Sequence, residues 1–302
     1  MQRILLTGKN GQVGWELQTA LAPLGTIIAF DQGQMDFAHP DQIRRAIRET
    51  KPVLIVNAAA YTAVDKAESE PDLALQVNGI APGIMAEEAK RSGAILIHYS
   101  TDYVFDGELG RPYTEDDAPN PVNTYGRTKL AGEHAITAVG GKYVILRTSG
   151  VYSSRGSNFV LTILRAAREK AQLTVVDDQH GSPTWARALA AATADLLRQP
   201  ERIAARSGTY HLSAEGCASR YDLARTVVAI AREISRRPDG WAGIQPIHSD
   251  QYRPPPPAAR PSRPALALDR IRRVFGIRMQ DWEGQVGDFL RALATEGRPE
   301  LR

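Results

Sequence analysis

Near its beginning the chain reads Gln2-Arg3-Ile4-Leu5-Leu6-Thr7-Gly8-Lys9-Asn10-Gly11-Gln12-Val13-Gly14. The short apolar run at residues 2–7 predicts a strand, and Val13, Leu17 and Leu21 recur at the spacing of one helix face. Glycines between a strand and a helix allow a tight turn and a close approach of the backbone to a pyrophosphate. Their spacing, G-x-x-G-x-x-G, differs from the G-x-G-x-x-G of the dinucleotide fingerprint.

The same alternation of strand and helix continues to about residue 150. Short apolar runs at 26–30, 53–57, 94–99 and 143–147 are separated by helical patterns at 41–50, 71–92 and 125–138. Strands that alternate with helices predict an α/β fold with a doubly wound parallel sheet of the Rossmann type. Asp31 ends the second predicted strand, about 20 residues after Gly11, where a carboxylate can accept hydrogen bonds from a ribose.

After residue 150 the pattern changes. Helices are predicted at 158–170, 185–198, 220–236 and 282–294, strands at 173–176 and 209–212, and an irregular proline-rich loop at 253–264. We therefore expect a dinucleotide-binding domain at 1–150 and a smaller, mainly substrate-binding lobe at 151–302. Segments at about 173–200 are expected to pack back on the first domain.

Composition narrows the function. The 302 residues carry a net charge of +3, with an acidic half at 1–150 and a basic half at 151–302. The arginines of the basic half are scattered, so we expect no nucleic-acid partner. No apolar run approaches the roughly 20 residues that span a bilayer, and the single cysteine fits a reducing compartment, so we expect a cytoplasmic protein without a membrane partner.

One short motif indicates proton transfer. The stretch Tyr125-Gly126-Arg127-Thr128-Lys129 falls in a predicted helix, where residues four apart share a face. A lysine cation stabilises a nearby phenolate and is expected to lower the pKa of the tyrosine. The pair alone is weak evidence, because tyrosine and lysine at this spacing also occur by chance.

A second motif lies at the end of the fourth predicted strand, in the stretch His98–Gly107. Ligands of open α/β sheets bind beyond the carboxyl ends of the strands, so the hydroxyls of Ser100 and Thr101 are placed where chemistry is expected. We interpret His98, which belongs to the apolar stretch, as a core residue. The six histidines and the cysteine show no metal-ligand spacing.

Together these stretches resemble the extended short-chain dehydrogenase/reductases, and within them the dTDP-4-dehydrorhamnose reductase family. The resemblance runs over nearly the whole chain. It is carried by residues 8–17, 56–68, 99–107, 125–133 and 178–184 and by the arginine–proline loop near Arg260-Pro261.

The resemblance implies site residues. Tyr125 would be the proton donor, Lys129 would hold the nicotinamide ribose and tune the phenol, and Thr101 would orient the reacting oxygen. Cofactor contacts would come from Gly8, Gly11, Gln12, Val13, Gly14, Asp31, Asp36, Phe37, Ala60, Tyr61, Thr62, Tyr125 and Lys129. Substrate contacts would come from Thr101, Asp102, Tyr125, Gly150 and Arg260.

The implied reaction is NAD(P)H-dependent reduction of the C4 ketone of dTDP-4-dehydro-6-deoxy-L-mannose to dTDP-L-rhamnose, a step in nucleotide-sugar and polysaccharide biosynthesis. At two positions the chain departs from the family pattern, which affects how its residues are assigned. Gly150 stands where family members often carry a substrate-contacting tryptophan. Some members bind magnesium through acidic residues, one of which matches Glu16, but Arg187 and apolar residues occupy the later acidic positions, so we predict no metal.

Alternatives stay open at this point. The chain could be another nucleotide-sugar epimerase or dehydratase of the superfamily, which would recycle its nicotinamide, or a catalytically silent NAD(P)-binding regulatory subunit. The sequence leaves NADPH and NADH open, because Lys9 or Arg44 could offset the repulsion between Asp31 and a 2′-phosphate. It also leaves monomer and homodimer open.

Overall fold

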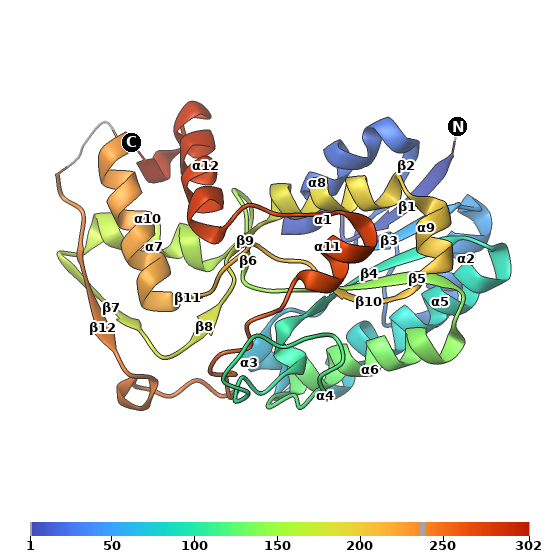
Figure 1. Cartoon of the computed structure of the whole chain (residues 1–302), viewed down its shortest axis with the longest axis horizontal. Coiled ribbons are helices and arrows are strands. Elements are labelled where there is room, and N and C mark those ends of the chain that lie inside the picture. Colours follow the sequence, from blue (N-terminus) through green and yellow to red (C-terminus); the bar gives the residue numbers. More distant parts are fainter. Residues whose placement is uncertain (1, 236–238, 302) are drawn as a thin grey trace.

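The computed structural model describes residues 2–235 and 239–301, and its centre is a six-stranded parallel sheet (Figure 1). The strand order is β10-β5-β4-β3-β1-β2, so the direction of winding reverses between β1 and β3. The predicted α/β fold is confirmed, and the first five strands lie within two residues of their predicted ends. The bounds are β1 Arg3–Thr7, β2 Thr26–Phe30, β3 Leu54–Asn57, β4 Ile95–Thr101, β5 Lys142–Thr148 and β10 Gly208–His211.

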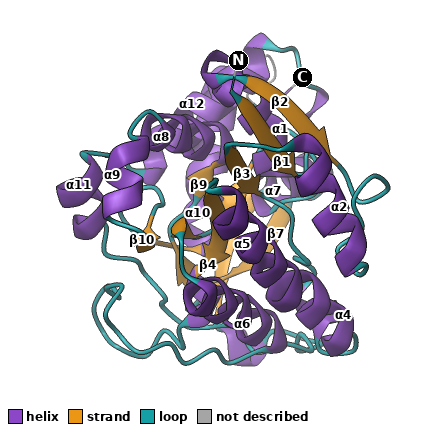
Figure 2. Cartoon of the chain, turned by 90° about the vertical axis from the view of Figure 1, so that its right-hand side faces the viewer, coloured by secondary structure: helices purple, strands orange, loops and turns teal. Residues whose placement is uncertain are grey.

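Helices cover both faces of this sheet (Figure 2). Because successive strand side chains point to opposite faces, Ile4 and Leu6 pack with helices α1 and α8, whereas Leu5 packs with α2 and α5. Helix α6 covers the second face beside α5. The bounds are α1 Gln12–Leu21, α2 Pro40–Thr50, α5 Ala81–Ser92, α6 Thr124–Val139 and α8 Ala186–Leu197.

A second lobe follows the sheet in the chain and has its own apolar core, which includes Leu164, Val227 and Phe289. It contains α7 Phe159–Glu169, α10 Arg220–Ile234, α12 Trp282–Thr295 and the parallel pair β7 Gln172–Val176 and β12 Gly243–Ile247. Short strands complete it: β6 Val151–Tyr152, β8 His180–Gly181, β9 Thr184–Trp185 and β11 Ala218–Ser219. The predicted end of the 220–236 helix lies outside the described residues.

The helix expected at 71–92 is confirmed in its bounds, but a π-helical turn that the sequence did not indicate lies within it. The segment forms α4 Pro71–Leu75, a π-helical turn at Gln76–Ile80 and then α5. In the turn, the side chain of Asn78 accepts a hydrogen bond from the Tyr61 backbone N–H (2.8 Å) and donates to Thr128 Oγ1 (3.2 Å). The π-helical turn therefore accompanies a tertiary contact that helical periodicity does not reveal.

Several short elements had no signal in the sequence, because each is a few residues long and depends on its neighbours. These are α3 Val64–Ala67, α9 Pro200–Ala205, α11 Asp269–Phe275, the strands β6, β8, β9, β11 and β12, and the single turns at Ala22–Leu24, Asp102–Val104, Ser249–Gln251 and Pro299–Leu301. Among the described residues, no helix is long and apolar enough to cross a membrane.

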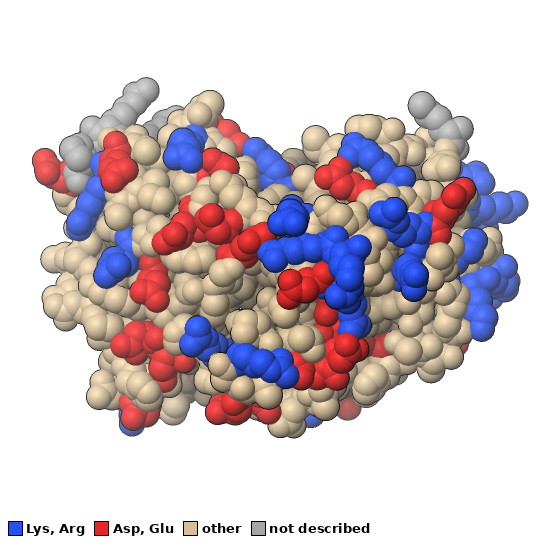
Figure 3. All heavy atoms as spheres, viewed as in Figure 1, with Lys and Arg blue, Asp and Glu red and all other residues tan. Residues whose placement is uncertain are grey.

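Basic side chains on the surface lie beside acidic ones (Figure 3). Arg272 pairs with Glu215, and Arg270 lies 3.5 Å from a carboxylate oxygen of Glu115. Part of the positive charge of the C-terminal half is thus balanced locally.

Helix α6 is held closely against its neighbours by a glycine. A Cβ atom added to Gly132 would lie 2.1 Å from the backbone carbonyl oxygen of Asn78. This distance is far inside van der Waals contact, and the obstacle is backbone, which cannot rotate away. Close packing of α6 on the π-helical turn therefore requires glycine at this position.

We expect Gly132→Ala to destabilise the protein by roughly 1–3 kcal/mol, because overpacking of a buried contact outweighs the better helix propensity of alanine. Gly287→Ala in α12 is the matched control, since its Cβ would meet only the flexible end of Arg291 at 3.2 Å. Thermal unfolding should show a lower Tm for the first variant and an equal or higher Tm for the second. Equal effects would contradict the packing argument.

Candidate active site

A cavity of about 870 Å³ lies at the carboxyl ends of the parallel strands. Its wall includes residues at the ends of β1, β3, β4 and β5 or directly after them, among them Gly8, Ala58, Thr101 and Ser149. The cavity spans the point between β1 and β3 where the winding of the sheet reverses. This is where open α/β sheets bind their ligands.

The glycine turn forms one wall. Gly8 has a φ of +72°, and a Cβ there would lie 2.8 Å from the carbonyl oxygen of Ala58, so the position requires glycine. Gly8, Gly11, Gln12 and Val13 line the cavity. Gly14 does not: a Cβ there would lie 2.0 Å from the carbonyl oxygen of Gly8, so it allows α1 to pack on the turn. The structure thus gives Gly14 a packing role, and its contact with cofactor stays a prediction.

Asp31 lies at the carboxyl end of β2 and also faces the cavity. Lys9 Nζ lies 3.1 Å from its carboxylate, and Asn10 donates a hydrogen bond to it at 3.3 Å. The hydrogen bond from Lys9 is the main reason that the pKa of Asp31 lies below its ordinary value. The other residues expected at this end, Asp36, Phe37, Ala60, Tyr61 and Thr62, line the same cavity.

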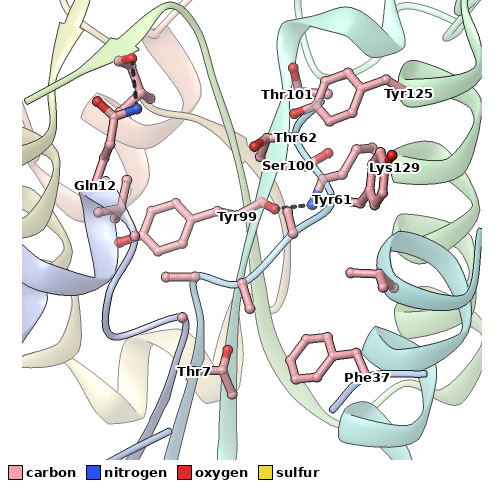
Figure 4. A pocket seen from close by; sticks show the side chains of 18 of the residues that line it. Thr7, Gln12, Phe37, Tyr61, Thr62, Tyr99, Ser100, Thr101, Tyr125 and Lys129 are labelled. Atoms are coloured by element: carbon pink, nitrogen blue, oxygen red, sulfur yellow. Dashed lines mark hydrogen bonds between the residues drawn. The ribbon is translucent and has the colours of Figure 1, made fainter. Parts of the chain in front are cut away.

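Tyr125 and Thr101 face each other at the opposite end of the cavity (Figure 4). Asn123 caps α6 by accepting a hydrogen bond from the Gly126 N–H at 2.8 Å, which places Tyr125 in the first turn. Burial raises the pKa of the Tyr125 phenol well above its ordinary value, and the hydrogen bond with Thr101 opposes the rise. The expected lowering of this pKa was wrong for this structure, because desolvation outweighs the other effects.

Lys129 lies one helical turn further along α6 and is buried. Its Nζ donates to the carbonyl oxygen of Tyr99 at 2.6 Å and lies 3.2 Å from His98 Nε2. Burial lowers the pKa of Lys129 to about 8, and the charge of Glu133 acts in the opposite direction. Two polar partners thus fix the amine at the cavity wall.

Asp102 is a buried carboxylate directly after β4. It accepts hydrogen bonds from Thr101 Oγ1 at 3.0 Å and from Ser149 Oγ at 2.6 Å. Burial raises the pKa of Asp102 to about 6, although both hydroxyls act to lower it. The hydroxyl of Thr101 is therefore oriented by Asp102 while it faces Tyr125.

The remaining expected substrate contacts are placed differently. Gly150 lines the cavity with a φ of +56°, and a Cβ there would lie 3.1 Å from the Ser182 carbonyl oxygen. Arg260 is not among the cavity-lining residues, since both of its terminal nitrogens bind the Asp65 carboxylate, at 2.9 and 2.8 Å. Its guanidinium charge is therefore already balanced within the protein.

Sequence reasoning missed two residues at the carboxyl end of β5: Thr148, its last residue, and Ser149, which follows it. Ser149 binds Asp102, and Thr148 Oγ1 is a buried hydroxyl on the cavity wall without a hydrogen-bond partner in the described structure. The rule that led to Ser100 and Thr101, polar residues at the ends of parallel strands, would have found both.

The structure does not fit a magnesium site at Glu16. Its carboxylate is mostly buried and lies 3.1 Å from Arg187 Nε, so a guanidinium occupies the position of a cation. Among the described residues, no three or more His, Cys, Asp and Glu side chains are grouped to hold a metal ion.

Residues 1–295 match the protein family described as RmlD substrate binding domain. The chain is 42% identical to the dTDP-4-dehydrorhamnose reductase of Burkholderia thailandensis, over 97% of this chain and 100% of the relative. It is 44% identical to that of Escherichia coli K12, over 97% and 98%.

Solved structures give the same picture. A dTDP-4-dehydrorhamnose reductase from Bacillus anthracis in complex with NADP superposes with a TM-score of 0.88 at 34% identity, covering 97% of this chain and 100% of that one. A UDP-glucose 4-epimerase from Thermus thermophilus in complex with NAD has a TM-score of 0.75 at 20% identity, covering 96% and 99%, and shows a shared fold.

The Asp102 site generates a prediction about pH. The pKa of Asp102 in the folded protein, about 6, exceeds its ordinary value of 3.8. Protonation of Asp102 therefore favours the folded state: this contribution to stability is fully present below about pH 4 and is lost as the pH rises through about 6. Asp102→Asn, which stays neutral, should raise the Tm at about pH 8 and leave it unchanged at about pH 4. At about pH 8 the gain in free energy of unfolding is at most on the order of 3 kcal/mol, because one pKa unit corresponds to about 1.4 kcal/mol.

Asp106→Asn is the matched control. Backbone and side-chain hydrogen bonds lower the pKa of Asp106, so this variant should lose stability at neutral pH. A Tm of Asp102→Asn below that of the unmodified protein at about pH 8 would show that the carboxylate is needed for stability.

Proposed function

This chain belongs to the family described as RmlD substrate binding domain, and on that premise we propose that it reduces a dTDP-linked keto sugar with NADPH or NADH. The reaction is reduction of the C4 ketone of dTDP-4-dehydro-6-deoxy-L-mannose to dTDP-L-rhamnose. The observation that carries this proposal is that Tyr125, Thr101 and Lys129 line the same cavity as the glycine turn.

The residues present fit a nicotinamide dinucleotide. The cavity is large enough for a nucleotide, its glycine turn leaves the backbone accessible at the start of α1, and Asp31 offers a carboxylate at the second strand end. The hydroxyl of Thr148 gives a further donor or acceptor without a partner among the described residues. When bound, this cofactor supplies the hydride that is added to the C4 carbon.

The chain's own residues supply the proton. As negative charge builds on the C4 oxygen, the phenol of Tyr125 transfers its proton to that oxygen, which becomes the product hydroxyl. Thr101, held by Asp102, orients the oxygen toward the phenol. The tyrosine is left as a phenolate, which a cationic Lys129 favours.

The finer assignments are part of the same proposal. Residues 1–150 would bind the dinucleotide, and residues 151–302 would mainly bind the sugar nucleotide, although α8 of this second part packs on α1 in the core of the first. If Arg260 contacts the nucleotide diphosphate, it would do so while its guanidinium is ion-paired with Asp65. We propose a cytoplasmic protein without a nucleic-acid partner, as a monomer or homodimer.

Replacement of the proton donor tests the reaction. Tyr125→Phe should lower kcat by roughly 10²–10⁴-fold, because general acid catalysis is lost, while cofactor affinity stays nearly unchanged. The measurement is NAD(P)H absorbance with the dTDP-keto sugar, with a GDP-linked sugar as the substrate control. Tyr210→Phe is the matched variant, since the Tyr210 phenol donates to the carbonyl oxygen of Arg206, away from the cavity.

The outcomes separate the alternatives. Unchanged turnover in Tyr125→Phe would exclude its role as the proton donor. Turnover of the sugar without net NAD(P)H consumption by the unmodified protein would indicate an epimerase or dehydratase. Absence of any activity, together with a stoichiometric enzyme partner, would indicate a regulatory subunit.

Cofactor preference should depend on Lys9. Arg44 is ion-paired with Glu87 and Glu88, so Lys9 is the cation that lies beside Asp31. Lys9→Ala should weaken binding of NADPH by roughly tenfold more than binding of NADH, because the 2′-phosphate then faces the Asp31 carboxylate alone. Fluorescence titration with both cofactors measures the two Kd values.

Lys142→Ala is the control for this experiment. It removes the same charge at the start of β5, at the opposite end of the sheet, and should change neither affinity. If Lys9→Ala weakens both cofactors equally, Lys9 does not select between them.

A further inference from the structure

A chain of buried polar groups connects the two ends of the cavity beneath its floor. Thr7 Oγ1 donates to Asn57 Oδ1 at 2.7 Å, Asn57 Nδ2 lies 2.9 Å from His98 Nδ1, and His98 Nε2 lies 3.2 Å from Lys129 Nζ. All four residues are at most 1% exposed. Thr7 and Lys129 both line the cavity, whereas Asn57 and His98 lie behind them.

The orientation of the Asn57 amide is fixed by a backbone group. The N–H of Ala59, which can only donate, lies 3.2 Å from Asn57 Oδ1. This atom must therefore be the carbonyl oxygen, and the NH₂ group must face His98. Because NH₂ also only donates, His98 Nδ1 accepts and carries no proton.

The tautomer of His98 follows. Burial and the neighbouring Lys129 hold the pKa of His98 well below its ordinary value, so the ring is neutral. A neutral ring without a proton on Nδ1 carries it on Nε2, the atom that faces Lys129. An ammonium group has three donors and no acceptor, so His98 Nε2–H can bond to Lys129 only when the lysine is an uncharged amine.

The second partner of Lys129 is compatible with this state. An amine keeps N–H donors, one of which reaches the carbonyl oxygen of Tyr99 at 2.6 Å, while its lone pair accepts from His98. The charged group that acts on this nitrogen is Glu133 on α6, whose carboxylate is paired with Arg147 on β5 at 2.6 Å. Tyr125, one turn earlier on α6, is a neutral phenol.

We propose that His98, oriented by Asn57, is a positioning residue that favours the uncharged form of Lys129 and so sets the pH range in which this lysine is charged. The lowered pKa of Lys129, about 8, agrees with this role. The consequence for turnover rests on the proposed function: if a cationic Lys129 favours the phenolate of Tyr125, reduction slows as the pH rises through the pKa of the lysine.

The tautomer can be tested without substrate. In protein labelled with ¹⁵N-histidine, the ring nitrogen shifts of His98 should show a bare Nδ1 and a protonated Nε2 at neutral pH. His211 is the other fully buried histidine. The signals lost in the His211→Phe variant belong to His211, which separates them from those of His98. A proton on Nδ1, or a doubly protonated ring, would overturn the proposal whatever the protein's activity.

The kinetic test replaces His98, the hydrogen-bond donor to Lys129. His98→Phe removes the hydrogen bond that favours the amine, so the alkaline fall in kcat should move up by roughly half to one pH unit. His211→Phe makes the same change at a buried histidine that contacts the Ala267 carbonyl oxygen and should leave the profile in place. A lower kcat in His98→Phe without movement of the profile would reduce His98 to a packing residue and overturn the proposal.

A second variant keeps the ring. Asn57→Asp retains acceptors for Thr7 and Ala59 but must accept from His98 Nδ1, which reverses the tautomer and leaves Nε2 as an acceptor for an ammonium group. The alkaline limb should again move to higher pH, and ¹⁵N shifts should show the proton on Nδ1. An unchanged limb with a reversed tautomer would show that His98 does not control Lys129.

Discussion

Strand β4 is buried along its whole length, and the site depends on how its polar side chains are satisfied. All seven residues from Ile95 to Thr101 are buried, yet His98, Ser100 and Thr101 carry polar atoms. A buried polar group without a partner costs roughly 1–3 kcal/mol, so each of these residues requires a specific neighbour. Ser100 donates to Glu133, Thr101 to Asp102, and His98 contacts Asn57 and Lys129.

These requirements position helix α6. Tyr125, Lys129 and Glu133 are spaced four apart and form one row along the helix. Their partners Thr101, Tyr99 and Ser100 are the last three residues of β4. Glu133 is anchored further by Arg147 of β5, through a buried two-point ion pair at 2.6 and 3.0 Å. The proposed catalytic pair, Tyr125 and Lys129, is thus positioned by the same contacts that join the helix to two strands.

The features that could be predicted from the sequence are those set by residues close together in the chain. The glycine turn, the strand ends and the Tyr125–Lys129 spacing are patterns within a few residues, and the structure places them on one cavity. The ion pairs Arg147–Glu133 and Arg260–Asp65 join distant segments, and no local pattern specifies them. The expected direction of the Tyr125 pKa shift was wrong for a related reason. Burial is a property of the folded chain, whereas the neighbouring lysine is visible in the sequence.

A raised pKa is consistent with a proton donor. If the phenol lost its proton near neutral pH, only a fraction of the protein molecules would carry a protonated donor. Burial raises the pKa of Tyr125 and so keeps the phenol protonated at neutral pH. In the proposed reaction, proton transfer from Tyr125 becomes favourable when negative charge develops on a substrate oxygen beside Thr101, because that oxygen is the stronger base at that moment. The charge left on the phenol needs a cation nearby, and Lys129, whose pKa of about 8 lies close to neutrality, can gain or lose that charge with little change in free energy. Burial therefore acts on the two residues in complementary ways, since it stabilises the neutral donor and makes the charge of its neighbour adjustable.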